Sequence, residues 1–213
     1  MRPQQPGMLV TVDGLGGAGK STLVQLVTER LTERGYPVHA TTEPSRAPLG
    51  EIARYGTNTY HGLALACLVA ADRYHHLDSE IRPQLRGGFI VLCDRYMASS
   101  LVLQRMDGVP ADYVQALNVH ADIPDLAVVL TADPAVTAER IRVRGSHGRF
   151  ENGLNTSRTE AELYQDAITR LDELGWPLWL LDTSAVAPEA LAEQVTARIT
   201  ELADDRSASA ATA

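Results

Sequence analysis

Eight residues near the start of the chain, GLGGAGKS at positions 14–21, have the residue types and the spacing that hold phosphate groups. Glycines let consecutive backbone N–H groups converge on a phosphate, and a helix beginning just after them adds the positive end of its dipole. Lys20 is the only lysine among 19 basic residues, which indicates a position that needs a compact ammonium to reach the β- and γ-phosphates of a nucleotide. The predicted nucleotide-binding residues are Gly14, Gly16, Gly17, Ala18, Gly19, Lys20, Ser21 and Thr22.

Asp94 and Arg95 follow the apolar run 88–93 and form a second group of residues that could take part in catalysis. Asp94 is expected at the carboxyl edge of a sheet, where it can bind Mg²⁺ together with the hydroxyl of Ser21. Phosphoryl transfer requires alignment and positive charge around three phosphoryl oxygens, so arginines such as Arg95 are what the reaction needs. Asp13, at the end of the first apolar run, is a further catalytic candidate.

These residues must be positioned by an α/β fold. Short apolar runs rich in β-formers alternate with longer helical patterns, and this alternation predicts βαβ units with helices on both faces of a parallel sheet. We therefore predict a three-layer α/β/α fold of the P-loop NTPase type, with a mobile lid. The five predicted strands are 8–12, 37–42, 88–93, 125–131 and 177–182.

Local signals place two of the helices and the loops. Apolar spacing predicts a helix over 21–34 that ends at Gly35, and Asp133-Pro134 is a typical helix start. The segment 145–157 has three glycines and no periodicity, so we predict a lid at about 144–157. We expect a single domain over residues 1–203 and a disordered tail over 204–213, which is small and polar.

Composition excludes several classes of protein. A net charge of −8 argues against a protein that wraps a nucleic-acid backbone, and no apolar run is long enough to cross a membrane. Cys67 and Cys93 lie in apolar runs without metal-ligand spacing, so we expect buried, reduced thiols and a cytoplasmic location. The adjacent His75 and His76 would face different directions on a helix, which disfavours a metal site there.

Several segments in order resemble the thymidylate kinase family, from the phosphate loop to about Glu151. They are VDGLGGAGKST (12–22), TTEPS (41–45), LVAADRYHHL (68–77), VLCDRYMASSLVLQ (91–104), PDLAVVLTADPAVTAERIRVRG (124–145) and GRFE (148–151). The resemblance implies an ATP-dependent, Mg²⁺-requiring nucleoside monophosphate kinase. It also implies a homodimer formed through helices that include residues 63–74.

The resemblance assigns roles to several arginines. Arg95 would hold the phosphate of the acceptor, and Arg73 would lie over its base. A basic lid would cover the donor phosphates, with Arg142, Arg144 and Arg149 as candidates and Arg149 as the best match. Glu43 of the TTEPS segment would complete the acceptor site. Thr42 replaces the arginine that the family has in this segment, and Arg46, just after it, is the candidate to stand in for that arginine.

The chain departs from the family where the acceptor is recognised. The family's loop carries an acidic residue that contacts the sugar 3′-hydroxyl, and this chain has Gly16 there. The aromatic residue that stacks on thymine is replaced by Val69, and Ser100 and Leu103 stand where the family has other residues near the deoxyribose. The resemblance alone implies dTMP as the acceptor, whereas the altered pocket predicts a modified pyrimidine nucleotide or another phosphorylated small molecule.

Two alternatives remain open at this point. A nucleoside kinase would use Asp13 as the general base that takes a proton from a 5′-hydroxyl. A nucleotide-binding switch without catalysis would need the phosphate loop but neither Arg95 nor a basic lid.

Overall fold

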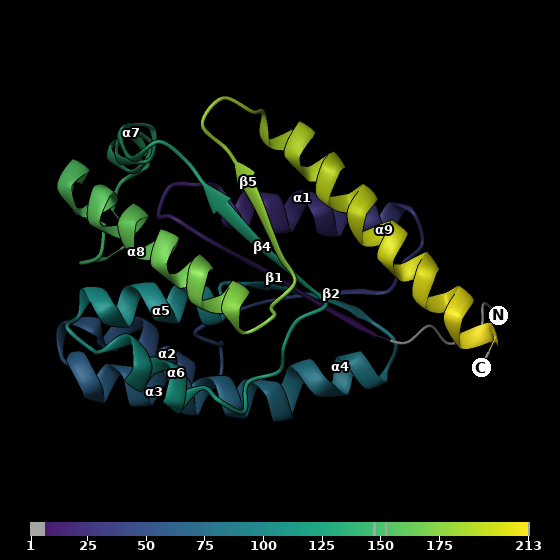
Figure 1. The fold of residues 1–213 in the computed structure, drawn as a ribbon, viewed down its shortest axis with the longest axis horizontal. Coiled ribbons are helices and arrows are strands. Elements are labelled where there is room, and N and C mark those ends of the chain that lie inside the picture. The colour runs from purple at the N-terminus through teal and green to yellow at the C-terminus, as the bar shows by residue number, and fades with distance from the viewer. Residues whose placement is uncertain (1–6, 147, 152, 213) are drawn as a thin grey trace.

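A computed structural model of the chain describes residues 7–146, 148–151 and 153–212. Its five strands form one parallel sheet in the order β2-β3-β1-β4-β5 (Figure 1). The strands are β1 (Met8–Gly14), β2 (Val38–Thr42), β3 (Ile90–Asp94), β4 (Leu126–Thr131) and β5 (Leu178–Asp182). The predicted parallel sheet is confirmed, because all the strand pairings are parallel and each of the five apolar runs overlaps one strand.

The sheet's central strands are buried on both faces. β1 is buried along all seven residues, and β3 and β4 are buried except at their last residue. Burial on both faces requires a continuous apolar run instead of an alternating pattern, and the sequence has such a run in each of these strands. Because all five strands run parallel, their carboxyl ends lie at one edge of the sheet.

Helices cover both faces of the sheet (Figure 1). Helices α1 and α9 pack together on one face, whereas α3, α4, α5 and α8 lie on the other. The helices are α1 (Lys20–Glu33), α2 (Pro48–Tyr55), η1 (Gly56–Asn58), α3 (Gly62–His76), the π-helical turn η2 (Leu77–Ile81), α4 (Arg82–Arg86), α5 (Met97–Met106), α6 (Ala111–Leu117), α7 (Pro134–Arg144), α8 (Gly153–Glu173) and α9 (Pro188–Thr212).

The two helix boundaries expected from local signals are present. Asp133 accepts a hydrogen bond from the amide of Ala135 at 2.7 Å, and Pro134 occupies the first position of α7. Gly35 follows α1 with φ +83°, a left-handed conformation that glycine adopts without a steric penalty.

The C-terminal tail and the lid differ from the expectations. The tail expected to be disordered over 204–213 is helical to Thr212, with Ala213 outside the described residues, because alanine-rich sequence extends α9 and Arg206 contacts Asp125. The second half of the predicted lid belongs to α8, which begins at Gly153, and positions 147 and 152 lie outside the described residues.

Cys67 is exposed, whereas Cys93 is buried as expected. The apolar run that contains Cys67 is long enough to circle helix α3, so some of its members face outward; Leu63, one turn earlier, is 55 % exposed.

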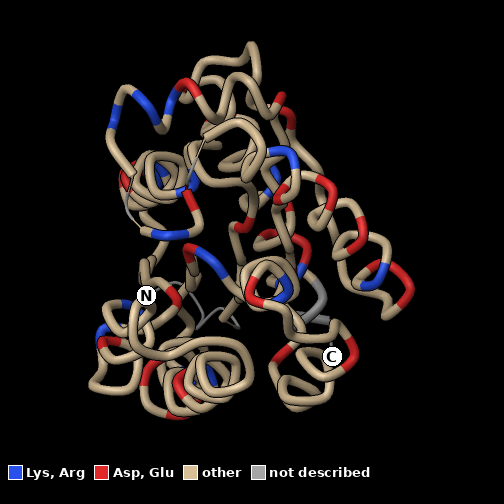
Figure 2. The backbone as a smooth tube through the Cα atoms, turned by 90° about the vertical axis from the view of Figure 1, so that its left-hand side faces the viewer, with Lys and Arg blue, Asp and Glu red and all other residues tan. Residues whose placement is uncertain are grey.

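Charged residues of both signs are interspersed over the molecule (Figure 2). In that view, blue and red segments alternate along the helices instead of separating into a basic face. Among the described residues, no helix combines the length and the apolar character needed to span a membrane.

Candidate active site

The chemically capable residues meet at the carboxyl edge of the sheet. β1 and β3 are neighbours in the sheet although they are not consecutive in the chain, and Val12 lies beside Asp94 in their register. Open parallel sheets bind ligands in the crevice at the carboxyl ends of such neighbouring strands. A cavity of about 580 Å³ opens here, between the phosphate loop and residues from helices α2, α3, α5 and α8.

The phosphate loop folds back on its own lysine. Gly17 and Gly19 have φ values of +78° and +94°, which explains their identity. The Lys20 ammonium donates hydrogen bonds of 2.7 Å to the carbonyls of Gly14 and Leu15. Burial, and then the nearby charge of Arg95, lower the pKa of Lys20 to about 7.

Ser21 and Asp94 form an oxygen-only pair next to the loop. The Ser21 hydroxyl donates to Asp94 Oδ2 at 2.5 Å, and Asp94 Oδ1 is buried without a hydrogen-bond partner among the described residues. An unpartnered carboxylate oxygen beside a hydroxyl fits the ligand preference of Mg²⁺. The predicted metal-binding residues therefore lie together.

Arg95 occupies a strained turn at the end of β3. Its φ is +73°, and its amide donates to the carbonyl of Val12 at 2.9 Å. Nη1 of Arg95 is buried and has no hydrogen-bond partner among the described residues, so it can donate to an anion in the cavity. A non-glycine residue held in this conformation is typical of a functional site.

Asp13 lies beneath this turn instead of facing the cavity. Its Oδ1 accepts hydrogen bonds from the amides of Tyr96 and Ser99 at the start of α5, at 2.9 and 2.8 Å. Asp13 is 2 % exposed and is not among the residues that line the cavity. Burial raises the pKa of its carboxyl group. This geometry suits a helix cap better than a general base.

Arg73 is fixed inside a polar network on the acceptor side of the cavity. Its guanidinium donates to Glu43 Oε2 at 2.8 Å, to Asn118 at 2.6 Å and to Ser100 at 2.8 Å, and it is 1 % exposed. The guanidinium also lies 4.9 Å from the centre of the Tyr96 ring. So many partners leave Arg73 oriented before any ligand binds.

All seven residues predicted to bind the acceptor line the same cavity. They are Glu43, Arg46, Val69, Arg73, Arg95, Ser100 and Leu103. Arg54, which belongs to none of the sequence motifs, lies among them and contacts the carbonyl of Pro44. Arg46, Arg54 and Arg95 thus line one cavity, and burial together with the charges of the other two arginines lowers the pKa of Arg54.

The lid arginines are distributed differently from the expectation. Arg144 lines the cavity and pairs with Glu151 at 2.6 Å, and Arg142 is exposed and pairs with Glu139. Arg149, the best match by resemblance, does not line the cavity. It pairs with Asp107 at the end of α5 at 2.7 Å and stacks on the ring of Phe150 at 4.2 Å.

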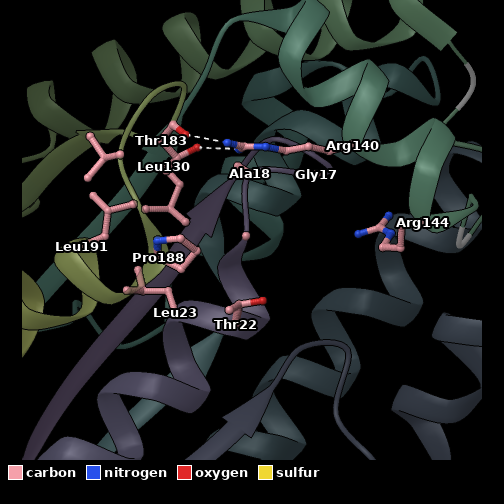
Figure 3. Close-up of a pocket in the computed structure, with 12 residues that line it drawn as sticks. Gly17, Ala18, Thr22, Leu23, Leu130, Arg140, Arg144, Thr183, Pro188 and Leu191 are labelled. Carbon is pink, nitrogen blue, oxygen red and sulfur yellow. Dashed lines mark hydrogen bonds between the residues drawn. The ribbon is translucent and has the colours of Figure 1, made fainter.

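A second cavity of about 320 Å³ lies on the other side of the phosphate loop (Figure 3). Figure 3 shows Arg140 of α7 reaching Thr183, and Arg144 lying farther along the same helix. Apolar side chains, which include Leu23, Pro188 and Leu191, line the opposite wall. A flat ring could rest between this wall and the arginines.

Glu160 is the most informative lining residue that motif reading missed. Helix α8 buries a stripe of Ser157, Glu160, Tyr164, Ala167 and Leu171. A carboxylate in the buried stripe of an amphipathic helix needs a special reason, and this pattern was visible in the sequence. Tyr164, one turn later, accepts a hydrogen bond from the amide of Gly14 at 3.2 Å.

Comparisons with known proteins agree on one family. The family model for thymidylate kinase matches residues 12–173. The chain is 36 % identical to a probable thymidylate kinase of Caldivirga maquilingensis over 84 % of this chain and 87 % of the relative. It is also 36 % identical to a probable thymidylate kinase of Pyrobaculum aerophilum, over 87 % and 93 %. A thymidylate kinase of Xanthomonas oryzae pv. oryzae is 35 % identical over 72 % and 70 %.

Proposed function

The chain belongs to the thymidylate kinase family and is a nucleoside monophosphate kinase, and from this premise we propose that it transfers the γ-phosphoryl group of ATP to a pyrimidine nucleoside monophosphate. The observation that carries the proposal is the convergence of Arg46, Arg54 and Arg95 on the cavity that also contains the phosphate loop. Three arginines provide a site for a second phosphate group opposite the donor.

The donor side would hold ATP across the two cavities. The base would rest in the smaller cavity against Arg140 and the apolar wall, and the phosphates would lie along the loop. Lys20 would exchange the carbonyls of Gly14 and Leu15 for phosphate oxygens. Ser21 and Asp94 would hold Mg²⁺, which neutralises phosphate charge when it is bound.

The acceptor side needs alignment more than proton transfer. The phosphate oxygen of a monophosphate is already ionised at neutral pH, so attack requires no general base. Arg95, with a buried Nη1 free to donate, would bind that phosphate, and the fixed Arg73 would lie against the base. This assignment gives Asp13 a structural task, in keeping with its two backbone partners.

The acceptor pocket supports a base or sugar different from the usual pair. Val69 and Leu103 line it where the resembled family has larger or polar partners. Loss of a stacking ring removes about 1 kcal/mol of binding free energy. The altered pocket therefore favours a modified pyrimidine nucleotide or another phosphorylated small molecule as the acceptor, with dTMP as the acceptor that family membership alone implies.

We also propose a homodimer that uses the outward face of α3. Leu63 and Tyr60 are 55 % and 40 % exposed, and Cys67 lies next to Tyr113, which is 40 % exposed. Apolar side chains grouped in this way are typical of a protein interface. Sedimentation of the purified chain distinguishes a dimer from a monomer.

The proposed reaction is tested by product analysis with paired substrates. The purified protein is incubated with MgATP and either pyrimidine monophosphates or the matching nucleosides. We expect nucleoside diphosphates from the monophosphates, and a loss of about 10³-fold in kcat/KM for Arg95→Ala, because a charged phosphate partner is removed. Arg198→Ala, on the exposed part of α9, is the matched control. Phosphorylation of the nucleosides alone, or ATP hydrolysis without transfer, contradicts the proposal.

A further inference from the structure

Gly16 differs from the other glycines of the phosphate loop. Gly14, Gly17 and Gly19 have positive φ values, but Gly16 does not. Its backbone conformation is therefore open to other residues, and the reason for a glycine must lie in what surrounds it.

Two carboxylates fill the space next to Gly16. A Cβ atom at this position would lie 3.3 Å from Glu151 Oε1 and 3.4 Å from Glu160 Oε2. The Gly16 amide donates to both carboxylate oxygens of Glu160, at 3.0 Å each. The absence of a side chain on the loop thus leaves room for a carboxylate that comes from helix α8.

Glu160 keeps much of its capacity to accept hydrogen bonds. Its two oxygens share a single N–H donor, whereas an ionised carboxylate offers about four acceptor positions. Glu160 is 3 % exposed, and no ion pair to it is found in the described part of the chain. Burial raises the pKa of its carboxyl group, while the charge of Lys20, the hydrogen bond from the Gly16 amide and the charge of Arg95 oppose this. Such a group is poorly satisfied until a donor enters the cavity that it lines.

The chemistry of the cavity selects the donor. A phosphate would be repelled by Glu160 and attracted by Arg95, so the acceptor's phosphate belongs on the arginine. The sugar is covalently joined to that phosphate and is the next part of the acceptor within reach. Its hydroxyls are neutral donors, and the 3′-hydroxyl is the secondary hydroxyl that ribose and deoxyribose both carry.

We infer that Glu160 is a specificity-determining residue that accepts a hydrogen bond from the 3′-hydroxyl of the acceptor sugar, an inference that rests on the proposed function. A side chain at position 16 would project toward Glu160, because its Cβ would lie 3.4 Å from Glu160 Oε2. A carboxylate at position 16 and a carboxylate at position 160 are alternatives, because both together would place like charges in contact.

The test compares two acceptors within each variant. The kcat/KM for thymidine 5′-monophosphate is divided by that for 3′-deoxythymidine 5′-monophosphate, so that the fraction of folded enzyme cancels. We expect Glu160→Ala to lower this ratio about tenfold or more, since a hydrogen bond to a charged group is lost. Glu160→Gln, which keeps the shape, should lower it less. Glu162→Ala, an exposed neighbour on α8, should leave it unchanged.

Moving the carboxylate back to the loop gives the decisive variant. Gly16→Asp alone should lose activity because three carboxylates would crowd the loop. Gly16→Asp combined with Glu160→Ala should restore the ratio to within about threefold of the wild type, since one charge-assisted hydrogen bond is regained. A ratio that stays constant in Glu160→Ala while both acceptors are phosphorylated overturns this inference alone. A wild-type protein that phosphorylates no monophosphate overturns the proposed function and the inference together.

Discussion

The carboxylate of Asp13 accepts a 2.8 Å hydrogen bond from the backbone amide of Ser99, so the end of β1 caps the start of α5. The amide of Tyr96 donates to the same oxygen at 2.9 Å. Arg95 lies immediately before these amides in its strained turn. Asp13 therefore fixes the segment that presents Arg95 to the cavity, although it does not reach the cavity itself.

This relationship predicts how Asp13 variants behave. Asp13→Asn keeps an oxygen acceptor, so kcat for the monophosphate should fall less than about tenfold, whereas loss of a general base costs about 10²-fold or more. Asp13→Ala should lower the free energy of unfolding by about 2–4 kcal/mol, because two buried amides lose their partner. Denaturant unfolding and steady-state kinetics measure both effects. A large loss of kcat in Asp13→Asn with normal stability would return Asp13 to the role of base.

The two lid arginines should have separable effects. Arg144 lines both cavities, so Arg144→Ala should raise KM for ATP by about tenfold, as expected for a lost charged contact to phosphate. Arg149 is held by Asp107 and Phe150, so Arg149→Ala should change KM for ATP less than Arg144→Ala does. Asp107→Asn is the control for the Arg149 contact, and it should resemble Arg149→Ala. The reverse order of KM effects would mean that Arg149 leaves Asp107 to reach the donor phosphates.

The sheet could be predicted from sequence because each strand is a short apolar run between clear turn and helix signals. Strand β1 leads into the glycine loop, and β3 ends at Asp94. The position of each motif at the end of a strand therefore also predicts that it lies at the carboxyl edge of the sheet. The end of α9 was harder. Its alanines and serines are compatible with a disordered tail or a helix, and the contact of Arg206 with Asp125, 81 residues away, decides for the helix.

The site was predictable where a motif fixes local geometry and less so where contacts are distant in sequence. Six of the eight loop residues, together with Asp94 and Arg95, line the larger cavity; Gly14 and Ala18 do not. The position of Arg149 depends on Asp107, 42 residues earlier, which no local pattern reports. Arg54 and Glu160 reach the cavity from helices α2 and α8. Glu160 has a sequence signal, a carboxylate in the buried stripe of an amphipathic helix, whereas Arg54 has none.

The lowered pKa of Lys20 predicts a proton uptake when ATP binds. With a pKa of about 7 in the free protein, Lys20 is mostly neutral at pH 8, and anionic phosphates favour its protonated form. Binding therefore raises the pKa, and affinity for MgATP should fall by up to about tenfold per pH unit above pH 7. Calorimetry at pH 8 in buffers of different ionisation enthalpy should detect the uptake of nearly one proton. Lys20→Met should abolish the uptake, and an uptake that persists in this variant would assign the proton to another group.

Truncation tests whether the end of α9 stabilises the fold. Asp204 accepts a hydrogen bond from the Tyr36 hydroxyl at 3.1 Å, and Arg206 contacts Asp125 and donates to the carbonyl of Gly7 at 3.0 Å. A chain that stops at Ala203 loses all of these contacts. Its free energy of unfolding should fall by about 1–3 kcal/mol, which lowers Tm by about 2–4 °C for each kcal/mol in a chain of this size. A chain that stops at Ala208 keeps the contacts and should unfold within about 0.5 kcal/mol of the full chain. Equal stability of the two truncated chains would mean that these contacts add nothing, whereas the expected difference shows that the end of α9 stabilises the segments that lead into β1, β2 and β4.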